Sequence, residues 1–251
     1  MYKAYFKKIF CSPSIYFCIL MTAVIASVRF LYNNDGGDVV ATIDIMLDLD
    51  GMRKVILIFA AVPFAANYCT EYNNGYANMC LIRTYPGKYI NSNLLAGAVS
   101  SFAVTFMGLI VFLMYLSVNI PFYESSAGSA PMPYGYFLNI NCPIIYIMIR
   151  ISIYAVSNSM WVISGIALSS IIPNSFAAIC SPYIFSYVLE KLTMKLPDCF
   201  NLFYLTLSRD ILGQDALITY TYTIGIFIVL MLFWSFIFRT FVRRRIKNEI
   251  V

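Results

Sequence analysis

The chain has 251 residues, of which 61% are hydrophobic and 12% are charged, and its mean hydropathy is +0.76. About a quarter of the residues are charged in an ordinary soluble domain. This composition therefore excludes a large soluble domain and predicts a single polytopic membrane domain over residues 1–251. The chain has no histidine, which excludes His-based acid–base catalysis and most zinc chemistry.

Six segments are long and apolar enough to cross a bilayer, which takes ~20 residues in a helix. They cover residues of about 14–32, 53–70, 94–117, 144–169, 172–191 and 218–238. We therefore expect an all-α membrane protein with six transmembrane helices. Pro173, Asn174 and Ser175 separate the fourth and fifth spans, which predicts a tight turn there.

Three regions outside the spans carry structural signals of their own. Residues 2–12 are rich in Tyr, Phe and Lys and predict an interfacial helix on the inner leaflet, broken at Ser12-Pro13. Residues 119–141 contain several prolines and predict an outer loop that is at least partly non-helical. Residues 193–216 are too apolar for a solvated linker, so we expect them to dip back into the outer leaflet as one or two short helices.

The distribution of Lys and Arg predicts the orientation of the spans. With both termini inside, the inner segments carry Lys3, Lys7, Lys8, Arg83, Lys88, Arg239, Arg243, Arg244, Arg245 and Lys247. The outer segments carry fewer basic residues, among them Arg53 and Lys54, and most of the acidic ones. This is the positive-inside pattern, and it predicts a multi-pass cell-membrane protein with both termini in the cytoplasm.

The loop after the second predicted span combines charge, glycine and aromatic residues. It reads Glu71-Tyr72-Asn73-Asn74-Gly75-Tyr76 and, further on, Arg83-Thr84-Tyr85-Pro86-Gly87-Lys88. A carboxylate is costly inside lipid, so Glu71 marks the inner boundary. We expect a short amphipathic helix parallel to the membrane, ended by Pro86, that docks on a cytoplasmic partner. The alternative is an ordinary interfacial loop that only sets the topology.

In these motifs the sequence resembles the permeases of type-2 ABC exporters, especially small bacterial permeases for bacitracin export and lantibiotic immunity. The likeness rests on Glu71-Tyr72 with Gly75, on Pro86-Gly87-Lys88, and on the order of the predicted elements along the chain. It implies a cytoplasmic coupling helix between spans two and three that contacts an ATPase. The implied ATPase-coupling residues are Glu71, Tyr72, Gly75, Tyr76, Arg83, Pro86 and Lys88, with Lys3, Lys7 and Lys8 as a second cytoplasmic contact.

The chain contains no G-x-x-x-x-G-K-[ST] motif, so it lacks a P-loop of its own for ATP phosphates. We therefore expect no cofactor on this chain, with ATP and Mg²⁺ held by a separate partner. The expected complex has two ABC ATPase subunits and a second copy of the chain or a homologous permease, surrounded by membrane lipids. We expect no nucleic-acid partner, no catalytic residue and no metal site.

These observations predict the permease subunit of an ATP-driven exporter in a bacterial cell membrane, without enzymatic activity of its own. The expected substrate is an antimicrobial or bacteriocin-like peptide, or a lipid-like amphipathic molecule, moved outward. One alternative is an immunity module that expels or sequesters an antimicrobial peptide at the outer surface. Another is a membrane protein unrelated to ABC systems.

Single polar residues leave further alternatives open. Arg150 lies inside the fourth predicted span, where it could line a wet groove or reach the outer headgroups with its long side chain. Asp44 and Asp48 are spaced i,i+4 and suit a cation site or, as the simpler alternative, a solvated helix face. Cys142 and Cys199 are the two cysteines on the predicted outer face, and the sequence leaves open whether they pair.

Overall fold

The computed structural model describes residues 2–32, 37–77, 85–123, 134–207 and 215–250, and every regular element in these ranges is helical. In chain order these elements are α1 (Tyr2–Phe10), α2 (Pro13–Tyr32), α3 (Val39–Asp48), α4 (Asp50–Ala61), α5 (Asn67–Asn73), α7 (Pro86–Asn119), α8 (Gly135–Asn139), α9 (Pro143–Ile171), α10 (Ser175–Thr193), the 3₁₀ turn η1 (Asp198–Phe200), α11 (Leu202–Thr206) and α12 (Ala216–Ile250). The predicted all-α class is confirmed for this part of the chain.

Three of the described helices are long and apolar enough to cross a membrane, namely α7, α9 and the stretch Ala216–Arg245 of α12. Helices α1 and α2 supply a fourth candidate if the pair, bent by 49°, forms one span. The protein is thus an α-helical membrane protein. The predicted second span is not one helix, because α4 ends at Ala61 and α5 begins at Asn67. The count of six spans remains a prediction.

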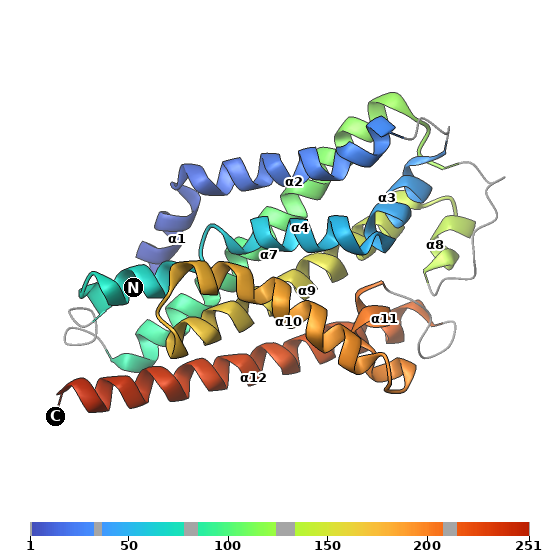
Figure 1. The fold of residues 1–251 in the computed structure, drawn as a ribbon. Coiled ribbons are helices and arrows are strands. Elements are labelled where there is room, and N and C mark those ends of the chain that lie inside the picture. The colour runs from blue at the N-terminus through green and yellow to red at the C-terminus, as the bar shows by residue number, and fades with distance from the viewer. Residues whose placement is uncertain (1, 33–36, 78–84, 124–133, 208–214, 251) are drawn as a thin grey trace.

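The long helices run side by side, and the molecule has two distinct ends (Figure 1). Both chain termini lie at one end, together with α1 and α5, and we call it the terminal end. Helices α3, α8 and α11 lie at the other end, which we call the opposite end. Helix α9 packs against α7, α10 and α12 and is the central element of the bundle.

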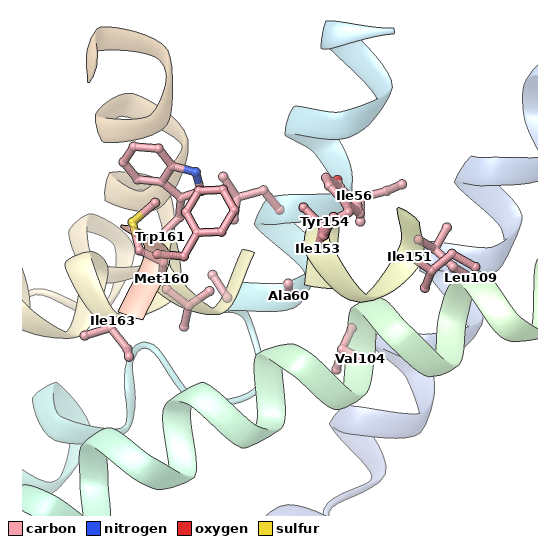
Figure 2. Close-up of a cluster of buried hydrophobic side chains, with 14 of the residues drawn as sticks. Ile56, Ala60, Val104, Leu109, Ile151, Ile153, Tyr154, Met160, Trp161 and Ile163 are labelled. Atoms are coloured by element: carbon pink, nitrogen blue, oxygen red, sulfur yellow. The ribbon is translucent and has the colours of Figure 1, made fainter. Parts of the chain in front are cut away.

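The core is built around the inward faces of α4, α7 and α9 (Figure 2). Ile56 of α4, Val104 of α7, and Ile151 and Tyr154 of α9 are each at most 1% exposed. Trp161 of α9 is the largest of the fully buried side chains. Large apolar side chains that leave water here contribute most of the packing energy between these helices.

Local sequence signals account for several helix ends. Proline opens both α7 and α9, at the position where its missing N–H costs least. The side chain of Asn174 caps α10 by accepting a hydrogen bond from the backbone N–H of Phe176 over 2.9 Å. The predicted tight turn between the fourth and fifth spans is therefore present, between α9 and α10.

The predictions for the segments outside the spans can be compared with the helices observed there. The break at Ser12-Pro13 separates α1 from α2, as predicted. Residues 193–216 contain η1 and α11, which agrees with short helices before the last span, and residues 119–141 contain the short helix α8. Pro86 begins α7, because its ring suits the first turn of a helix. The short coupling helix that the sequence predicts before Pro86 lies mostly in residues 78–84, outside the described residues.

Candidate functional site

The terminal end carries most of the residues that the sequence assigned to ATPase coupling, and Glu71 of α5 is at its centre. The Glu71 side chain is 6% exposed. Its Oε2 accepts hydrogen bonds from the hydroxyls of Tyr5 over 2.7 Å and Tyr89 over 2.9 Å. Its Oε1 accepts one from Asn67 Nδ2 over 3.0 Å and lies 3.4 Å from Lys8 Nζ.

These contacts join three helices through one carboxylate. Tyr5 and Lys8 come from α1, Asn67 and Glu71 from α5, and Tyr89 from the first turns of α7. Hydrogen bonds to an ionised carboxylate are the stronger kind, and each buried donor here has its partner. Glu71 therefore fastens α1 to the start of the long helix α7. The sequence suggested that Glu71 could present a free charge at the surface. The structure instead buries this carboxylate among hydrogen-bond donors.

A second set of contacts ties α5 to the ends of α9 and α12. The guanidinium of Arg245 lies 4.8 Å above the centre of the Tyr72 ring, a cation–π distance, and donates a hydrogen bond to the carbonyl of Ile171 over 2.8 Å. The Tyr68 ring packs edge-on against Phe238 of α12 at 5.2 Å. Helix α5 is thus the hub of the terminal end.

Gly75 follows α5 in the left-handed region, with φ of 70°. Its N–H donates to the carbonyl of Tyr72 over 3.0 Å, so the glycine closes the end of α5. The left-handed conformation costs L-residues with a Cβ about 1–2 kcal/mol. A glycine is therefore favoured by the backbone at this position, whether or not a partner approaches it.

Other predicted contact residues are exposed around this hub. Tyr76 is 53% exposed and Tyr85 is 79% exposed, and Lys7 and Lys88 are exposed as well. A cavity of about 560 Å³ opens beside them, lined by Ala4, Tyr5, Lys8, Thr70, Glu71, Asn74 and Tyr76. Basic and aromatic side chains thus surround a hollow at the terminal end. Arg83 and the side chain of Lys3 lie outside the described residues.

Near the opposite end, Arg150 of α9 lies in an environment that differs from both expectations, a wet groove and contact with the outer headgroups. Its side chain is 1% exposed, so it neither lines an open groove nor reaches toward the exterior. Its Nε donates to Asp44 Oδ1 of α3 over 3.0 Å, and Nη1 donates to the carbonyl of Leu207. Tyr146 donates to the other carboxylate oxygen over 2.7 Å. Arg150 thus connects α3, α9 and the residue after α11.

The electrostatics of Asp44 follow from this enclosure. Burial raises the pKa of the Asp44 carboxyl above its ordinary value, and the nearby guanidinium of Arg150 opposes that shift. Asp48 is exposed, so the solvated helix face expected for the two aspartates holds for Asp48 alone.

No group of three potential metal ligands occurs within the described ranges. Cys142 and Cys199 are free thiols.

The sequence places Arg53 and Lys54 in an outer segment and does not predict that they belong to a further charged cluster. Both are buried, at 3% and 5% exposure, and so is Glu190 of α10 at 5%. Glu190 Oε2 lies 2.6 Å from Lys54 Nζ and 3.2 Å from Arg53 Nη2. The available signal was an adjacent cation pair at the start of one apolar segment and a carboxylate at the end of another.

Comparison with known proteins gives no relative: the chain matches no protein-family model, no curated protein and no solved structure.

Proposed function

We propose that the chain is the membrane-spanning permease subunit of an ATP-driven exporter, and that the terminal end is the face on which the ATPase docks. The observation that carries the proposal is the Glu71 clamp. It joins α1, the end of α5 and the start of α7, immediately beside exposed basic and aromatic side chains and a cavity.

The clamp gives a mechanical route for coupling. Helix α7 is continuous from Pro86 to Asn119, so it extends from the terminal end toward the opposite end. A push on α1 or on the loop after α5 would move the start of α7 through Glu71 and Tyr89. At the far end of α7, the carbonyl of Pro121 accepts a hydrogen bond from the N–H of Val39, where α3 begins. Movement would thus reach α3 without any proton relay.

The proposal assigns two kinds of role to the terminal end. Glu71 and Tyr72 act as positioning residues, because their side chains are engaged with α1, α7 and α12. Tyr76, Lys7 and Lys88 are the contact residues, because they are exposed there. ATP and Mg²⁺ belong to the partner ATPase, and two such subunits would serve a pair of permeases in a bacterial membrane, with both termini in the cytoplasm.

The full topology and the cargo belong to the same proposal. We take α4 with α5 as the second span and α10 as the fifth, which gives six spans. The segment with η1 and α11 would lie in the outer leaflet. The cargo would be a peptide or an amphipathic lipid-like molecule that leaves along the apolar faces between two permeases.

Co-purification tests the docking face. A candidate P-loop ATPase from the same organism would be co-expressed with tagged variants, and the amount retained would be measured. Tyr76→Ala and Lys88→Glu should each lower retention, with the loss of an aromatic contact costing about 1–2 kcal/mol, roughly tenfold in affinity. Lys195→Glu is the matched control, because this exposed lysine follows α10 toward the opposite end.

Retention that stays at the wild-type level in both terminal-end variants would remove this support for an exporter. A loss of retention in Lys195→Glu as well would indicate a general effect of charge reversal. Transport of labelled peptides into inverted vesicles, measured alongside, separates loss of docking from loss of coupling. Glu71→Gln should lower transport more than it lowers retention, because the Glu71 side chain is almost fully buried and acts on α1 and α7.

A further inference from the structure

A small cavity lies where α4, α9, α10 and α11 meet, remote from the terminal end. Its volume is about 10 Å³, and its lining includes Arg53, Lys54, Tyr154, Ser157, Glu190 and Thr206. A space of this size is about the smallest that holds one water molecule, and a single halide ion is only slightly larger than water. Larger groups such as a carboxylate, a phosphate or a sulfate do not fit.

Arg53 lines this cavity, and one edge of its guanidinium is unpaired among the described residues. Nη2 is engaged by Asp50 at 2.9 Å and by Glu190 at 3.2 Å, whereas Nε and Nη1 are buried and have no hydrogen-bond partner among the described residues. A buried donor left without a partner costs about 1–3 kcal/mol, and more when the group is charged. Two adjacent donors on one cation therefore point to an acceptor that carries negative charge.

The local charge balance points the same way. Arg53 and Lys54 are both buried, and Glu190 is the one buried carboxylate in contact with them in the described part of the chain. Asp50 also contacts both cations, but its side chain is 47% exposed, so its charge is shared with the surroundings. Among the buried side chains of the cluster, two cations therefore face one carboxylate, and the half-exposed Asp50 offsets the remaining positive charge only in part. Burying a charge that is incompletely compensated is expensive.

We propose that this cavity is a binding site for a single halide ion, chloride under ordinary conditions, held by Nε and Nη1 of Arg53. The ion supplies the missing acceptor for both donors and compensates the remaining positive charge. Because α4, α9, α10 and α11 all line the cavity, the bound ion stabilises their junction. This site is independent of the docking face, so it stands or falls separately from the exporter proposal.

A water molecule is the competing occupant, and it differs from chloride in a measurable way. Water would accept the two hydrogen bonds but leave the remaining positive charge, so stability would not depend on the anion in the buffer. Chloride binds the folded state, so the melting temperature should rise with its concentration. Above the dissociation constant, each roughly tenfold increase in chloride should add the same increment of stability.

The first experiment uses the full wild-type chain in detergent. Its melting temperature would be measured as sodium chloride or sodium bromide replaces sodium gluconate at constant ionic strength. We expect a halide-dependent rise that becomes linear in the logarithm of the halide concentration, and no such rise in gluconate, which is too large for the cavity. A crystal grown in bromide should show one anomalous peak within hydrogen-bond distance of Arg53 Nε and Nη1. Equal stability in all three salts, with no bromide peak there, overturns the proposal in favour of water.

Variants test which groups hold the ion. Arg53→Lys keeps the charge but loses the Nε–Nη1 edge, so the halide-dependent shift should disappear. Glu190→Gln removes the competing carboxylate and should raise the apparent halide affinity at least about tenfold. Lys195→Gln, at an exposed position, is the control and should leave the shift unchanged. If a buried variant fails to fold, the wild-type titration and the bromide peak still decide the question.

Discussion

Arg150 and Asp44 are 106 residues apart in the chain, and they form an ion pair near the opposite end of the bundle. Arg150 Nε donates to Asp44 Oδ1 over 3.0 Å, and Nη2 lies at the same distance from the same oxygen. The guanidinium is almost fully buried and the carboxylate is 18% exposed. The pair holds α3 against the central helix α9 and so stabilises the contact between these two helices.

Replacing Arg150 should therefore destabilise the protein instead of being neutral. Arg150→Leu leaves a largely buried carboxylate without its partner, which costs up to about 3–5 kcal/mol. We expect a lower melting temperature in detergent and lower accumulation in the membrane. The double variant Arg150→Leu with Asp44→Leu should recover much of the loss, because no charge is then left unpaired. A melting temperature of Arg150→Leu equal to wild type would show that the pair contributes nothing.

Gly165 offers a test of the close contact between α9 and α10. A Cβ added there would lie 2.6 Å from the carbonyl oxygen of Ala178 and 2.7 Å from Pro182 Cγ. Neither neighbour is a flexible side-chain end, so the helices would have to move apart. Gly165→Ala should thus cost about 1–3 kcal/mol, measured as a fall in melting temperature.

Gly225 is the matched control for this helix contact. It lies in α12, and a Cβ there meets nothing within 4 Å. Because alanine favours the helix over glycine by about 1 kcal/mol, Gly225→Ala should be neutral or slightly stabilising. Equal effects of the two substitutions would contradict the close packing of α9 on α10.

Hydropathy was sufficient to predict the three longest apolar helices. The predicted spans 94–117, 144–169 and 218–238 lie within α7, α9 and α12, because long apolar runs have few other ways to satisfy the backbone in lipid. The break inside 53–70 was missed, although Pro63 lies between α4 and α5 and proline disrupts a helix interior. Average hydropathy does not register a single helix-breaking residue.

The partners of the charged residues could not be read from the sequence. Glu71 pairs with Tyr5, 66 residues earlier, and with Tyr89, 18 residues later. A carboxylate near the end of an apolar segment fits either an exposed contact or a buried clamp, and only the packing of α1 decides between them. The cluster of Arg53 with Glu190 joins residues that are 137 positions apart in the chain, so no local spacing pattern predicts it.

Gly75 should tolerate only substitutions that accept a positive φ. Gly75→Val places a β-branched residue at φ of 70° and should cost at least about 1–2 kcal/mol, whereas Gly75→Asn should be mild because Asn adopts this conformation readily. The readouts are the rate of limited proteolysis after α5 and the amount of ATPase retained. Gly87→Val in the first turn of α7, where a Cβ meets nothing within 4 Å, is the control.

The outcome for Gly75 separates backbone strain from side-chain bulk. If Asn and Val at position 75 perturb the loop equally, crowding by a side chain and not the left-handed backbone is the cause. The structure argues against crowding, because no heavy atom lies within 4 Å of a Cβ built on Gly75.

The two ends of the bundle should face opposite sides of the membrane. The prediction follows from the basic residues at the terminal end and the positive-inside rule. In a variant without its seven native cysteines, a membrane-impermeant maleimide applied to intact cells should label Asp198→Cys, and should reach Tyr76→Cys only after permeabilisation. Both positions are exposed, so a difference reflects sidedness and not burial.

Phe236→Cys supplies the control that separates exposure to lipid from exposure to water. This residue is 68% exposed on α12, within the stretch that is apolar enough to cross a membrane. It should resist the reagent before and after permeabilisation, because a maleimide reacts with the thiolate, which is disfavoured in lipid. Labelling of positions 76 and 198 from the same side would place both ends of the bundle on one face of the membrane. The terminal end could not then serve as a cytoplasmic docking face while the opposite end faces outward.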